Sequence, residues 1–93
     1  MLVLSRKIGD CIVIGDGFVV TVAFLAEDHA ELSLTRLDGS FVRSATVRCN
    51  EWFQVDDQIR VVVVQIEKEK ARIGIDAPSD NRVHRGEFWN LPR

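Results

Sequence analysis

Residues 50–75 read NEWFQVDDQIRVVVVQIEKEKARIGI, and this stretch decides the fold. Valine, isoleucine and phenylalanine recur in it at alternate positions, and polar clusters around Asp57 and Lys68 interrupt the alternation. Alternation with period two, broken by short polar turns, is typical of antiparallel strands joined as hairpins. The run at residues 61–64 consists of four valines, which favours a central strand buried on both faces.

The same pattern covers the rest of the chain. It predicts strands at residues 2–6, 11–14, 18–25, 30–36, 41–48, 52–55, 59–66, 71–75 and 82–85. Only residues 86–91 could be helical, and Gly86 and Pro92 restrict that helix to about one turn. We therefore expect an all-β, antiparallel fold with little or no C-terminal helix.

An internal repeat is visible when residues 9–34 are set against residues 50–75, a shift of 41 positions without gaps. The apolar positions and the turns coincide along the whole comparison. The identical pairs are Asp16/Asp57, Val20/Val61, Val22/Val63 and Ala30/Ala71. Because meanders with similar loop lengths share such a pattern by themselves, the comparison favours a duplication without requiring one. The candidate repeats are residues 1–41 and 42–93 of a single domain.

Composition excludes several classes of protein. A chain of 93 residues forms one domain, and its net charge of −2 provides no extended positive surface for DNA. We find no apolar run long enough for a membrane span, no signal peptide and no metal spacing around Cys11 or Cys49, so we expect a cytoplasmic protein with reduced cysteines. The sequence contains no paired carboxylates, nucleophile with a base, or phosphate-binding glycine loop, so we expect neither an enzyme nor a cofactor.

The two ends of the chain suggest a family. The opening MLVLSRKIGDCIVIGD (residues 1–16) and the closing RIGIDAPSDNRVHR (residues 72–85) resemble the two ends of the CsrA/RsmA family of carbon storage regulators, in the same order. The resemblance implies protomers of five strands that interlock as homodimers and bind GGA-containing leader messenger RNA. In that arrangement the first strand of one protomer and the last strand of the other build each RNA site.

This chain is longer than such a protomer, and the excess lies in the middle. Either a conventional protomer carries an insertion and still forms a homodimer, or a fusion of two repeats makes a single-chain pseudo-dimer; we favour the second. The first strand (residues 2–6) and the last (residues 82–85) would then lie together in one molecule. The middle segment SFVRSATVRCN (residues 40–50) would have to serve both halves, and it lacks the proline turn and the VHR ending. We therefore expect one good RNA site per chain.

The resemblance also assigns residues to that site. An arginine on a rigid strand can bind guanine O6 and N7 with its planar fork, and Arg85 is the first candidate, placed across from Arg6. Without the resemblance, Arg85 would be read as a solvated charge. By period two, Leu4 and Arg6 share one strand face, and Ser5 and Lys7 the other. The predicted RNA-binding residues are Leu4, Arg6, Lys7, Val83, His84 and Arg85.

Other residues have simpler interpretations. His84 has no nucleophile or carboxylate partner at a telling spacing, so it is a structural or binding residue rather than an acid–base catalyst. Trp52 and Trp89 have apolar neighbours, which favours a core or interface role over base stacking.

The resulting hypothesis is a translational regulator of the CsrA type whose partners are messenger RNA leaders and an antagonist small RNA. The alternative is a diverged protein-interaction module that pairs with another regulator and does not read RNA. The acidic charge balance favours this alternative, and retention of Leu4, Arg6, Val83 and Arg85 together favours the hypothesis of RNA binding.

Overall fold

The computed structural model describes residues 1–15 and 17–77, together with the backbone of residues 83–85. The proline corner at Pro78, the short helix considered for residues 86–91, and Trp89 lie outside the described residues. The strands are β1 (Leu2–Lys7), β2 (Cys11–Ile14), β3 (Phe18–Leu25), β4 (His29–Arg36), β5 (Phe41–Arg48), β6 (Trp52–Gln54), β7 (Arg60–Glu67), β8 (Lys70–Asp76) and β9 (Val83–Arg85). The expectation of an all-β antiparallel fold is confirmed, and every predicted strand is present within about one residue of its predicted ends.

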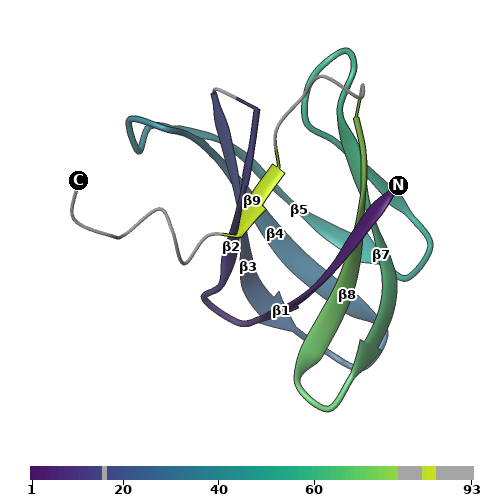
Figure 1. The fold of residues 1–93 in the computed structure, drawn as a ribbon. Helices are drawn as coiled ribbons and strands as arrows, with labels where there is room; N and C mark the ends of the chain where they lie inside the picture. Colours follow the sequence, from purple (N-terminus) through teal and green to yellow (C-terminus); the bar gives the residue numbers. More distant parts are fainter. Residues whose placement is uncertain (16, 78–82, 86–93) are drawn as a thin grey trace.

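The strands form two antiparallel sheets that pack face to face (Figure 1). One sheet has the order β1-β8-β7-β6, and the other has the order β5-β4-β3-β2-β9. The core lies between them and contains side chains from both sheets, among them Ile12, Leu32, Val61 and Ile73, all fully buried. No helix long and apolar enough to cross a membrane occurs in the described part of the chain.

The first three valines of the run behave as its composition predicts, whereas Val64, at a register shift of the ladder, is only partly buried. Strand β7 lies between β8 and β6, and Val61, Val62 and Val63 are all buried although they alternate between the two faces. On the outer face, Val62 packs close to Gly74 of the neighbouring strand, where the Met1 side chain also lies. The first residue of the chain therefore helps to cover the outer face of the central strand.

Each sheet combines strands from both halves of the chain. Strand β1 belongs to the first half but pairs with β8 of the second half. Strands β5 and β9 belong to the second half but pair with β4 and β2 of the first half. The middle segment forms one strand, β5, and among the described residues it forms a ladder with β4 alone. It acts as the first strand of the second half, and no described residues form the counterpart of β9 beside β6.

The ladders of the two halves have the same register at a shift of 41 residues. The matching pairs are Val20↔Leu34 with Val61↔Ile75, Leu4↔Ile73 with Ala45↔Leu32, and Arg6↔Ala71 with Val47↔Ala30. Both hairpins also have a bulge at the same point, between Val22 and Phe24 and between Val63 and Gln65. The two halves thus share their irregularities as well as their regular pairing.

The corner that follows the first strand of each half is also repeated. Gly9 has a φ of 90° and donates its N–H to the Val22 carbonyl at 2.8 Å. Asn50, 41 residues later, has a φ of 71° and donates to the Val63 carbonyl at 2.7 Å. Glycine and asparagine are the residues that best tolerate this left-handed conformation, so both corners have suitable residues for the passage between sheets.

Candidate nucleic-acid interface

The two strands assigned to the RNA site are edge strands of different sheets. Strand β1 ends the four-stranded sheet, and β9 ends the five-stranded sheet beside β2. The corner at Gly9 joins β1 directly to β2, so the two edges are connected by a few residues of chain. The backbone N–H of Lys7 and the Asp10 carboxylate close this corner at 3.1 Å.

Arg6 and Arg85 are not register partners. Arg6 lies opposite Ala71 in the β1–β8 ladder, and Arg85 lies opposite Ile12 in the β2–β9 ladder. This corrects the expectation that the first and last strands run side by side with the two arginines facing each other. The long-range pairing prevents it, because β1 and β9 each complete a sheet whose inner strands belong to the other half.

The faces of β1 follow the predicted period of two. Ser5 and Lys7 are exposed, whereas Leu4 packs against the core and Arg6 is only 8% exposed. The Arg6 Nε donates to the Ser5 carbonyl at 2.6 Å. Lys7 is therefore the most accessible cation of this edge, and Arg6 is held on the inner side of the strand.

The last strand is described by its backbone alone. Val83, His84 and Arg85 are opposite Ile14, Val13 and Ile12 respectively. Since Ile12 and Ile14 belong to the buried core, β9 borders an inner strand of the sandwich and is anchored along its length. Its other backbone edge has no strand partner in the described part of the molecule.

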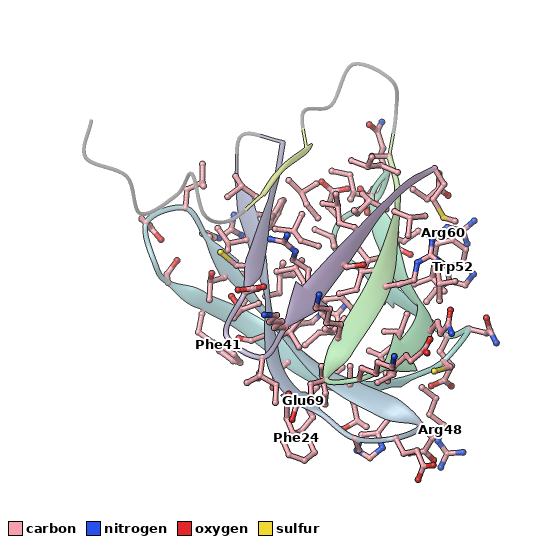
Figure 2. The ribbon with its side chains drawn as sticks, turned by 60° about the horizontal axis from the view of Figure 1, so that its bottom comes forward. Phe24, Phe41, Arg48, Trp52, Arg60 and Glu69 are labelled. Carbon is pink, nitrogen blue, oxygen red and sulfur yellow. The ribbon has the colours of Figure 1, made fainter. Side chains whose placement is uncertain are left out.

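Of the two roles expected for Trp52, core or interface, the structure excludes the core position. Its side chain is on the outer face of β6 and is 44% exposed. The Arg60 guanidinium stacks over its ring at 3.9 Å (Figure 2). Arg60 also pairs with Asp76 at 3.0 Å. The core interpretation is wrong because strand alternation gives the inner position to Phe53, which is only 2% exposed.

A second basic and aromatic group was missed by sequence reasoning. Arg43 of β5 lies over the Phe53 ring at 4.1 Å and donates to the Gln54 carbonyl of β6. The available signal was the repeat: residues 42–44 are the counterpart of β9, and they cannot pair with both β4 and β6. The repeat therefore indicated that the outer edge of β6 would have no partner strand.

The cysteines and the Asp38 carboxyl have local environments that the structure describes. Cys11 and Cys49 are both free, as expected, and burial raises the pKa of the Cys11 thiol. Hydrogen bonding from Ser40 lowers the pKa of the exposed Asp38 carboxyl, which closes a turn. Among the described residues, no three His, Cys, Asp or Glu side chains gather in a group that could hold a metal ion.

Comparison with known proteins gives the same family as the two ends of the chain. Residues 46–91 match the model of the CsrA global regulator protein family. The chain is 39% identical over 44 residues to the translational regulator CsrA of Geotalea uraniireducens, a match that covers 47% of this chain and 56% of that protein. It is 39% identical over 41 residues to the Rhodopirellula baltica protein of that name, covering 44% of this chain and 59% of the relative.

The protein of the same name from Halothermothrix orenii is 43% identical over 42 residues, which cover 45% of this chain and 52% of the relative. The chain thus spans little more than half the length of these curated relatives. No solved structure gives a significant match. The family match includes strands β6 to β9, whereas the opening residues 1–16 lie outside it.

Proposed function

Through its second half the chain belongs to the CsrA family of global regulator proteins, and we propose that it binds GGA-containing leader regions of messenger RNA and thereby regulates translation. The observation that carries this proposal is the family match over residues 46–91, which includes the VHR strand β9. The curated relatives are named translational regulators. RNA bound over a ribosome-binding site would exclude the ribosome, and a small RNA with several GGA motifs would compete for the protein.

The RNA site that we propose is the pair of edges formed by β1 and β9. Sequence-specific RNA recognition targets unstacked loop bases, which can bond to free strand edges and to arginine forks. Arg85 would bind a guanine, and the exposed Lys7 would bind the phosphate backbone. A base that turns inward at the β1 edge would contact Leu4 and Arg6. Val83 and His84 would belong to the same site as the other residues of β9, the strand that holds Arg85.

We further propose that the chain is a single-chain pseudo-dimer. Exchange of β1, β5 and β9 between the halves supports it, because the edges of both sheets then come from one molecule. Only one RNA site would be complete. At a shift of 41 residues, Arg6 corresponds to Val47, which is 3% exposed, and Leu4 corresponds to Ala45.

The matched variants Lys7→Ala and Arg48→Ala test this site. These residues occupy the same position in the two halves, both are exposed, and each variant removes one positive charge. Binding of a GGA-loop hairpin should weaken in Lys7→Ala, and the slope of log K against log salt should fall by about 0.7–0.9, as expected for one lost phosphate contact. Arg48→Ala should leave both values unchanged. Equal losses in both variants would exclude a single site at β1 and β9.

A further inference from the structure

The four-stranded sheet is one strand short. In the other sheet, β9 covers the edge of β2. The counterpart of β2 at a shift of 41 residues is β6, and the counterpart of β9 is residues 42–44, which are used in β5 instead. In the part of the chain that the structure describes, β6 therefore has no strand on its outer side.

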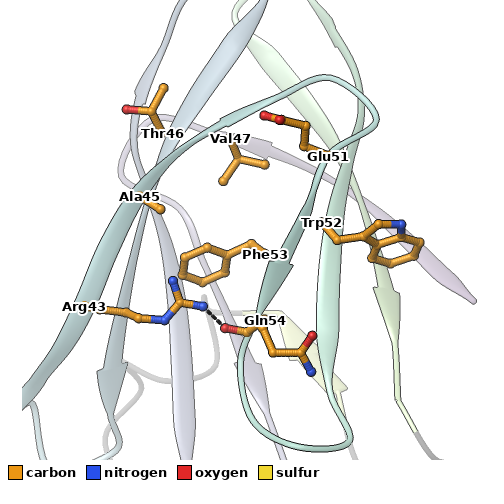
Figure 3. Close-up of a pocket in the computed structure, with 8 residues that line it drawn as sticks. All are labelled: Arg43, Ala45, Thr46, Val47, Glu51, Trp52, Phe53 and Gln54. Atoms are coloured by element: carbon orange, nitrogen blue, oxygen red, sulfur yellow. Dashed lines mark hydrogen bonds between the residues drawn. The ribbon is translucent and has the colours of Figure 1, made fainter.

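An arginine side chain occupies the place of that strand. The Gln54 carbonyl points out of the sheet and accepts a hydrogen bond from the Arg43 guanidinium (Figure 3). In an antiparallel strand the backbone N–H and C=O of one residue face the same side, so the backbone N–H of Gln54 faces away from β7 as well. Gln54 corresponds to Val13, whose register partner in the complete sheet is His84. Arg43 thus donates where a neighbouring backbone would donate.

The space beside this edge is a groove. It has a volume of about 390 Å³ and lies between β5 and β6, and Arg43, stacked on the Phe53 ring, is among the residues that line it (Figure 3). The other lining residues are Ala45, Thr46, Val47, Glu51, Trp52 and Gln54.

Within the described part of the chain, the groove is lined by one basic and one acidic side chain, Arg43 and Glu51, which form no ion pair with each other. Arg43 has no carboxylate partner among the described residues, and its contacts are the Gln54 carbonyl and the Phe53 ring. The Glu51 carboxylate already accepts the backbone N–H of Arg48 at 2.8 Å. An incoming acidic group can therefore pair with the Arg43 guanidinium, while the Glu51 carboxylate keeps its negative charge away from Arg43 (Figure 3).

We propose that the β6 edge is a docking site for an extended, acidic peptide segment of a partner protein, which adds to the sheet as its fifth strand. The backbone of the peptide takes over the Gln54 carbonyl and amide, and Arg43 moves onto a peptide carboxylate. Unpaired strand edges accept peptides in this way, with backbone hydrogen bonds for affinity and side-chain pockets for selectivity. In the order β1-β8-β7-β6 the groove lies at the opposite edge from β1, so RNA and peptide can bind together.

The probe is a fluorescein-labelled peptide, DNEVHEG, which is residues 80–86 with glutamate in place of both arginines. Two control peptides and two protein variants separate the backbone and charge contributions. The peptide DNEVPEG lacks the N–H opposite Gln54, and the peptide DNRVHRG reverses the charge. In the protein, Gln54→Pro removes an outward donor at an edge position, where proline is tolerated.

Fluorescence anisotropy with the full chain should show binding of DNEVHEG. The dissociation constant of each control peptide should be about tenfold higher than that of DNEVHEG, or higher still. Gln54→Pro, shown to be folded by circular dichroism, should lose binding, and Arg43→Gln should lose the preference for DNEVHEG over DNRVHRG. The proposal is overturned by undetectable binding, by unchanged affinity in Gln54→Pro, or by equal affinity for the two charge forms. Competition with a GGA hairpin would also overturn it, because the groove would then belong to the RNA surface.

Discussion

Replacement of Gly74 by alanine tests the packing that anchors the first strand. A Cβ atom at Gly74 would lie 2.7 Å from the Met1 sulfur and 3.0 Å from Val62 Cγ1. The Met1 side chain is flexible and can move away, but Val62 is buried in the central strand and cannot. Overpacking of this kind typically costs about 1–3 kcal/mol. The smaller backbone entropy of unfolded alanine offsets about 0.4–1 kcal/mol of it.

From the middle of both ranges, the expected net loss of stability is roughly 1.3 kcal/mol. For a chain of this size the unfolding entropy makes 1 kcal/mol equivalent to about 5 °C, so the melting temperature should fall by about 6 °C. Thermal unfolding followed by circular dichroism measures this shift. Ser33→Ala, at the matching position of the other half, is the control and should change the stability by less than about 0.5 kcal/mol.

A double-mutant cycle identifies the atom responsible. Val62→Ala removes Cγ1, so Gly74→Ala should be less damaging in that background than in the parent. A melting temperature for Gly74→Ala equal to or above that of the parent would refute the packing argument. So would an additive double mutant, because the contact between residues 62 and 74 would then carry no energy.

Two further predictions concern the turns. Lys68 and Glu69 have φ values of 51° and 66° in the tight β7–β8 hairpin, so Lys68→Asn with Glu69→Gly should stabilise the protein by about 1 kcal/mol; an unchanged midpoint in urea would contradict this. Ser40 donates to Asp38 and lowers the pKa of its carboxyl, so Ser40→Ala should raise that pKa toward its ordinary value in an NMR titration. Because the folded pKa is depressed, the stability that this contact contributes is present above about pH 4 and is lost as the pH falls through the folded pKa. A difference in stability between parent and Ser40→Ala that persists at low pH would contradict the assignment.

Much of the fold could be predicted because each strand has its own local pattern. The alternation of buried residues in β3, β4, β7 and β8 is strong enough to place their ends within a residue. The pairing of β1 with β8 has no local signal, since it joins residues that are nearly the whole chain apart. The resemblance suggested exchange of strands between halves, but the position of β1 and β9 in separate sheets required the structure.

The site residues show the same limit. The alternation with period two correctly placed Leu4 and Arg6 on the same face of the strand. The charge of Arg6 by itself, however, would predict an exposed side chain. The structure instead has Arg6 on the inner side, only 8% exposed, with its Nε donating to the Ser5 carbonyl. For Trp52 the signal was present, because neighbouring Phe53 is in the inward phase of the alternation. Its apolar character was given more weight than its position.

Native mass spectrometry of the protein with a GGA-loop hairpin tests the central claim most directly. We predict one 10.5 kDa chain bound to one RNA, and a loss of about 1–3 kcal/mol in binding free energy for Arg85→Ala, the usual effect of a lost bidentate guanine contact. Two chains with two equivalent RNAs would contradict the single-chain site. RNA binding that is absent in the parent, or unchanged in Arg85→Ala, would contradict the proposed recognition of messenger RNA at β1 and β9.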